Sequence, residues 1–173
     1  MKKPTAKFPT EGLGEAYEKL LLLSMKEARE IKQVTAPVLH KIIDTSSEKL
    51  SELNELTREE AETISEYLKR DLKEAAEYMT KNGEEFKKWL AIDIELVENY
   101  LYDMFKEAAD KTTIELAQLK DDADSAEYHT GQITGPGVLV CDKCGENLHF
   151  KKPGHIPPCA KCNETKFHRL LCK

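Results

Sequence analysis

The sequence is poor in the residues that build β-rich or repetitive proteins. Aromatic residues make up only 7 % of its 173 residues, with 8 glycines and 7 prolines. Charged residues make up 34 %, well above the quarter that is usual in globular proteins. This composition disfavours a β-sandwich, a collagen-like repeat and a disordered chain, and it favours long helices with charged outer faces.

Long apolar runs are also missing. No run of about 18 apolar residues is present, so the sequence predicts no membrane-spanning helix. The longest apolar run near the start, Leu20 to Leu23, is too short for the core of a signal peptide. We therefore expect a cytoplasmic protein, in which the five cysteines are reduced and are metal ligands or free thiols.

Charge is spread unevenly along the chain. Residues 1–127 carry 19 Lys and Arg against 29 Asp and Glu, a balance of −10, and residues 128–173 carry 7 against 3, a balance of +4; the two sum to the overall −6. The acidic first part would repel phosphate, so only the basic tail is expected to contact nucleic acid. The candidate partner contacts in this tail are Lys143, Lys151, Lys152, Lys161, Lys166 and Arg169.

Apolar residues recur every three or four positions from about Glu11 to Lys120, which indicates amphipathic helices. Pro37 interrupts the first of them and predicts a kinked or two-piece helix. Thr57 and Glu60 form a capping box that predicts the start of a second helix. A third helix is expected to run unbroken over residues 84–120, and the segments together predict an antiparallel helical hairpin, coiled coil or three-helix bundle.

Catalytic residues are not predicted in this helical region. It lacks the Glu-x-x-His pairs of a di-iron bundle, and its carboxylate-rich faces are expected to be solvated. Nothing in the sequence therefore indicates an enzyme.

Two Cys-x2-Cys pairs separated by fourteen residues are the strongest signal in the chain: Cys141, Cys144, Cys159 and Cys162. This spacing is typical of a four-cysteine zinc ribbon, in which each pair holds the ion from one tight turn. Four thiolates complete the coordination sphere and leave no open position, so one structural Zn²⁺ is predicted. Iron in a rubredoxin-like site is the alternative.

Residues around the cysteines predict a small β module. Gly145 and Asn163 follow the last cysteine of each pair, where a positive φ is often required. Strands are expected at residues 138–140, 147–150 and 166–170. Cys172 has no partner at this spacing and is predicted to be an inert tail residue.

The fold class that follows is mainly α with a small β module. A helical region is predicted at residues 11–120, a linker and lead-in strand at 121–137, and a zinc ribbon at 138–173. We expect the ribbon to stand at the end of a helical rod and to fold separately from it.

Several stretches resemble the bacterial YbeL-type zinc-ribbon proteins: Leu56-Thr-Arg-Glu-Glu60, Lys69-Arg-Asp-Leu72, Asp110-Lys-Thr112, Tyr128-His-Thr-Gly131, Leu139-Val-Cys-Asp-Lys-Cys144-Gly, Pro158-Cys-Ala-Lys-Cys162 and Phe167-His-Arg169. The resemblance covers about residues 50–170. It implies helices followed by a zinc ribbon in a cytoplasmic protein of uncharacterised function, with the four cysteines as ligands. Asn163 departs from the glycine that is commoner at its position.

The sequence leaves more than one class of function open. The first is a noncatalytic adaptor or regulatory protein whose ribbon binds a macromolecule, with a protein as the expected partner and the helices available for homo-oligomer formation. The second is nucleic-acid binding through the basic ribbon face, with Phe150, Phe167 or His168 as stacking surfaces. A rubredoxin-like iron redox protein is the third.

Overall fold

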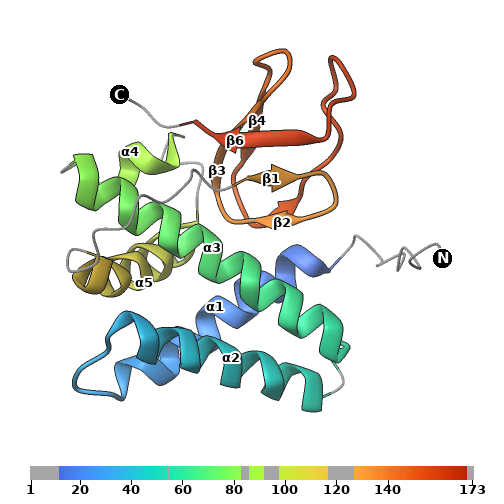
Figure 1. Ribbon diagram of the computed structural model, residues 1–173. Helices are drawn as coiled ribbons and strands as arrows, with labels where there is room; N and C mark the ends of the chain where they lie inside the picture. The colour runs from blue at the N-terminus through green and yellow to red at the C-terminus, as the bar shows by residue number, and fades with distance from the viewer. Residues whose placement is uncertain (1–11, 54, 83–85, 92–97, 117–126, 171–173) are drawn as a thin grey trace.

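A computed structural model describes residues 12–53, 55–82, 86–91, 98–116 and 127–170 (Figure 1). Five helices come first: α1 (Leu13–Arg29), α2 (Ala36–Glu52), α3 (Arg58–Asn82), α4 (Phe86–Leu90) and α5 (Asn99–Leu116). Six short strands follow: β1 (Tyr128–His129), β2 (Ile133–Thr134), β3 (Gly137–Cys141), β4 (Asn147–Phe150), β5 (Gly154–His155) and β6 (Lys166–Arg169). The mainly α fold class with a small β module is confirmed.

The helices pack around one apolar core. Helix α3 lies against α2 and α5, and α1 packs against α2, α3 and α5. Buried residues of the predicted stripes meet there, among them Tyr17, Leu21, Leu39, Ile43, Leu68, Leu72 and Phe105. Among the described residues, no helix is both long enough and apolar enough to cross a bilayer.

Local sequence patterns predicted the starts of two helices correctly. Pro37 lies in the first turn of α2, where its missing N–H breaks no helical hydrogen bond, so the two-piece prediction is confirmed. At the start of α3 the Thr57 N–H donates to the Glu60 carboxylate at 2.8 Å, and the Glu60 N–H donates to Thr57 Oγ1 at 3.2 Å. The capping box is therefore formed as predicted.

The prediction of one unbroken helix over residues 84–120 is wrong. Helix α4 ends at Leu90, and Ala91 has a φ of 53°, which a right-handed helix does not accommodate. Trp89 is fully buried and stacks on Phe86 and Phe105. The break thus accompanies the packing of Trp89 into the core.

The β module is a four-stranded antiparallel sheet in the order β1-β6-β3-β4, beside the two-stranded pair β2-β5. Strands β3, β4 and β6 lie where the sequence predicts them. Tyr128 pairs with Phe167 across β1 and β6, so the lead-in strand is part of the sheet. The start of the predicted linker, residues 121–126, lies outside the described residues, and the domain boundaries stay a prediction.

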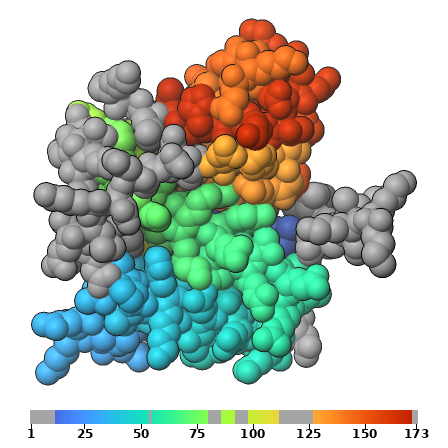
Figure 2. Space-filling view, viewed as in Figure 1, coloured from blue at the N-terminus to red at the C-terminus, as the bar shows by residue number. Residues whose placement is uncertain are grey.

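The β module packs directly on the helices. Strand β5 contacts α1, β2 contacts α1 and α3, and β3 contacts α4. Figure 2 shows the orange and red module seated on the green surface of α3. The expectation of a ribbon standing apart at the end of a rod is therefore wrong, because the ribbon covers a side of the helical body.

Candidate metal centre

The two Cys-x2-Cys turns have the same backbone geometry. In the first, the Gly145 N–H donates to the Cys141 carbonyl at 3.0 Å; in the second, the Asn163 N–H donates to the Cys159 carbonyl at 2.8 Å. In both turns the first cysteine donates its N–H to the carbonyl five positions later, at 2.9 Å. Backbone hydrogen bonds within each turn therefore close it without a metal ion.

A left-handed residue closes each turn. Gly145 has a φ of 73° and Asn163 a φ of 56°, as the sequence predicts. Glycine adopts this conformation without steric strain, and asparagine tolerates it better than most residues with a Cβ. The departure at Asn163 therefore leaves the second turn intact.

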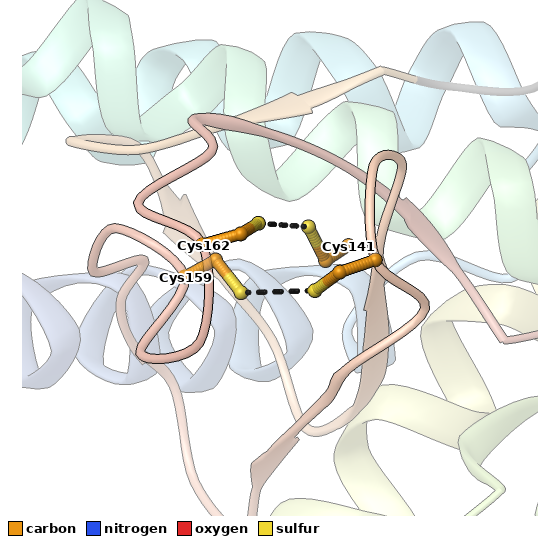
Figure 3. Close-up of side chains that lie close together, drawn as sticks. Cys141, Cys159 and Cys162 are labelled. Carbon is orange, nitrogen blue, oxygen red and sulfur yellow. Dashed lines mark hydrogen bonds between the residues drawn. The ribbon is translucent and has the colours of Figure 1, made fainter.

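The four sulfur atoms form one cluster between the turns (Figure 3). The Cys141 and Cys162 sulfurs are 3.5 Å apart, those of Cys144 and Cys159 are also 3.5 Å apart, and all four lie within 4.8 Å of one another. An ion with four metal–sulfur bonds of about 2.3 Å in a tetrahedron separates its sulfurs by about 3.8 Å. A disulfide brings two sulfurs to about 2.05 Å. The cysteines are free thiols, and their arrangement fits one tetrahedral metal ion.

Backbone groups also favour the ligand form of Cys159. Burial of the thiol raises its pKa, but hydrogen bonds, first those from the N–H groups of Cys162 and Lys161, bring the pKa down to about 7. The thiolate is the form that binds metal ions. The backbone of the second turn thus favours the thiolate at Cys159.

A protein-family comparison agrees with this geometry. The family model described as "Zinc-ribbon containing domain" matches residues 26–170. The chain belongs to this family. The matched region begins inside α1 and includes both the remaining helices and the sulfur cluster, so the family spans the helical body and the ribbon together.

Curated relatives in this family come from Escherichia coli strains K12, O6:H1 and O157:H7, each named "Uncharacterized protein YbeL". Each is 29 % identical over 80 residues, which are 46 % of this chain. The match spans half of each relative's length, 50 %. No solved structure matches the chain. The resemblance to YbeL-type proteins is confirmed, and neither the family description nor these names indicate catalysis.

The predicted cationic contacts of the ribbon divide into two groups. Five are exposed side chains: Lys143, Lys151, Lys152, Lys161 and Lys166. Two of them face carboxylates, Lys161 at 3.9 Å from Glu146 and Lys166 at 3.5 Å from Glu127. Arg169 is not a surface contact, because its side chain is 0 % exposed. Its prediction as a partner contact is wrong.

Not all of the residues predicted to stack on bases are exposed. Phe167 is buried in the small core of the ribbon beside Leu139 and Tyr128, so it cannot stack on a base. Phe150 is half-buried against the same core, and His168 is exposed beside Asp142. Cys172 lies outside the described residues.

Arg169 instead enters a group of polar residues between α3 and the ribbon, all buried except the half-buried Arg70. We call it the interface cluster: Arg70, Asp71, Glu74, Tyr128 and Arg169. Arg169 Nε donates to the Glu74 carboxylate at 3.0 Å. The other two nitrogens donate to the Pro136 carbonyl at 3.1 Å and to Thr134 Oγ1 at 3.0 Å. The guanidinium also lies over the Trp89 ring, 4.1 Å from its centroid.

Asp71 is the second centre of the interface cluster and is 0 % exposed. Its carboxylate accepts from Tyr17 Oη at 2.8 Å and from the Gly135 N–H at 2.7 Å. Arg70 donates to it at 2.9 Å and also to the Ile133 carbonyl at 2.8 Å. Arg70 and Asp71, both on α3, therefore bind the backbone of the β module directly.

Charges in the interface cluster balance. Two guanidinium groups face two carboxylates in a site from which water is largely excluded. Burial raises the pKa of Glu74, and the nearby Arg169 opposes that rise. Burial also raises the pKa of Tyr128 well above its usual value, so this residue stays a neutral hydroxyl that donates to Glu74. Each buried charge has an opposite charge and hydrogen-bond partners, the condition under which buried ions are tolerated.

Sequence reasoning missed the interface cluster, although one signal was present. Asp71 lies three positions after Leu68 and directly before Leu72, inside the apolar stripe of α3. A carboxylate there points to the core and requires a buried partner. Its buried partners Tyr17 and Gly135 are 54 and 64 positions away, and Arg169 reaches Glu74 across 95 positions, so spacing alone could not identify them.

Proposed function

We propose that this chain is a noncatalytic cytoplasmic adaptor or regulatory protein, in which one structural Zn²⁺ holds a ribbon that contacts a protein partner. The sulfur cluster carries the proposal. Four sulfurs converging from two closed turns fill all positions of a tetrahedral ion, which leaves none for substrate or water. Such a site stabilises a fold and does not activate a reactant.

Zinc is the ion that the family description supports. Tetrahedral sites of four sulfurs bind zinc or iron, and nothing in the arrangement of the four cysteines favours iron over zinc. When bound, the ion supplies cross-linking between the two turns. Reduced thiols are needed for it, which is consistent with a cytoplasmic location.

The charge of the ribbon favours a protein over nucleic acid as the partner. Its described residues carry five exposed lysines and four carboxylates, those of Glu127, Asp142, Glu146 and Glu164. Four thiolates around one divalent ion add a net charge of −2. With Arg169 neutralised by Glu74 and Asp71, the described part of the ribbon lacks the net positive charge that favours phosphate binding.

Two measurements test this proposal. The first is metal analysis of the purified chain, and the second is its titration with fluorescently labelled oligonucleotides of mixed sequence, both single-stranded and duplex. We expect one zinc per chain and, at physiological salt, no binding in the range of about 10⁻⁶ M that even non-specific DNA-binding proteins reach. The doubly substituted Lys151→Glu, Lys152→Glu chain should behave identically to a Lys41→Glu control on the helical body. Salt-sensitive binding that only the ribbon variant loses would support the nucleic-acid alternative instead.

A further inference from the structure

We propose that metal binding in the ribbon controls whether the ribbon stays docked on the helical body, because the strand that the metal holds carries Arg169 into the interface cluster. In the metal-bound state the ribbon covers Trp89, Asp71 and Glu74; on metal loss it undocks and exposes them. The inference rests on the proposed metal site but concerns what the ion does to the helices.

Strand β6 connects the two sites. Phe167 pairs with Cys141 on β3 and with Tyr128 on β1, so a metal ligand and a member of the interface cluster are its direct neighbours in the sheet. Asp142, inside the first turn, donates its N–H to the Lys166 carbonyl at 3.1 Å. Arg169 lies two residues after Phe167 and faces the same buried side. Ordering of the turns therefore fixes the position of Arg169.

The small ribbon core depends on the metal. Its buried members include Cys141 and Cys159 themselves, together with Tyr128, Leu139, Ile156 and Phe167. Without an ion, the sulfurs of the two turns meet in contacts of 3.5 Å, Cys141 with Cys162 and Cys144 with Cys159, which are far weaker than metal–sulfur bonds. A module with this few buried side chains is not expected to persist on apolar burial alone.

The docked position of Arg169 is tightly defined. Gly137 has a φ of 138°, and a Cβ added there would lie 2.2 Å from Arg169 Nη1 and 3.3 Å from the Leu90 carbonyl oxygen. The guanidinium therefore fills the space between the β3 backbone and the Trp89 ring. A loosened ribbon cannot keep this placement, and once it leaves, Asp71 also loses the Gly135 N–H.

Trp89 gives a direct readout of docking. It is the single tryptophan of the chain, it is 0 % exposed, and Arg169 lies over its ring. Undocking should expose the indole to water and to soluble quenchers. Its fluorescence therefore reports on the interface cluster, whereas the metal itself is quantified separately.

The test is stepwise chelation of the full-length chain, with released zinc followed by a colorimetric indicator and Trp89 followed by acrylamide quenching. We expect the quenching constant to rise several-fold in proportion to zinc release, and zinc addition to reverse it. Release of zinc with unchanged quenching would overturn the coupling but leave the metal site standing. A chain that binds no zinc in reducing buffer would overturn both proposals.

Two variants separate docking from metal binding. Arg169→Met is expected to retain one zinc per chain while Trp89 is already accessible to acrylamide, so that chelation changes the quenching little. Lys166→Met, on the exposed side of the same strand, should respond to chelation like the unmodified chain. Equal, full responses from both variants would show that Arg169 has no part in the coupling. If Arg169→Met fails to fold, the unmodified chain still decides the proposal by its own chelation curve.

Discussion

Replacing Cys159 by Ser is expected to abolish stoichiometric zinc binding and to unfold the β module. A structural zinc site provides about 10–16 kcal/mol of apparent binding free energy at neutral pH. That is comparable with the whole stability of a typical domain, about 5–15 kcal/mol. Cys159 is one of the two buried ligands, and the N–H groups of Cys162 and Lys161 favour its thiolate, so a serine hydroxyl is a poor replacement.

Metal analysis and two-dimensional amide NMR measure this outcome. The variant should lose the dispersed resonances of residues 127–170 but keep much of its helical circular dichroism, with a lower urea midpoint for the helices. A matched Cys172→Ser change, at the cysteine predicted to be inert, should alter neither zinc content nor the spectrum. The account of the ribbon would be contradicted by a Cys159→Ser chain that retains both one zinc and the dispersed resonances.

Replacing Arg169 by Met is expected to lower the free energy of unfolding by about 3–5 kcal/mol, the range seen when one partner of a buried ion pair is removed. Glu74 would then be left without its cation in a water-poor site, and Tyr128 would lose a hydrogen-bond donor. Urea denaturation followed by circular dichroism gives this value.

Two comparisons show whether the loss of stability comes from the buried ion pair of Arg169 and Glu74. Glu74→Met should reduce stability less in the Arg169→Met background than alone, because the uncompensated carboxylate is removed. Lys166→Met removes an exposed pair with Glu127 and should change stability by less than about 1 kcal/mol. A loss at Arg169 no larger than at Lys166 would contradict the ion-pair interpretation.

Features set by neighbouring residues were predictable from the sequence. The two cysteine turns follow from a two-residue spacing and a residue that accepts a positive φ, and both are local conditions. The start of α3 follows from Thr57 and Glu60, whose side chains accept from each other's backbone N–H groups. In each case the atoms that decide the conformation lie within a few positions of one another.

Features set by packing were not predictable in the same way. No glycine or proline occurs between residues 84 and 120 to signal the end of α4 at Leu90. Arg169 looks like one more surface cation, and only the folded arrangement brings it to Glu74 and Trp89. The first outcome accompanies the packing of Trp89 on Phe86 and Phe105, and the second depends on how the ribbon docks on the helices.

X-ray absorption at the zinc edge of the purified chain tests the central claim most directly. Four cysteine thiolates closing a tetrahedral site predict a first shell of four sulfur atoms at about 2.3 Å with no lighter atom. A shell containing nitrogen or oxygen would mean that one of the four cysteines is not a ligand, and the description of the ribbon as a closed structural site would fail.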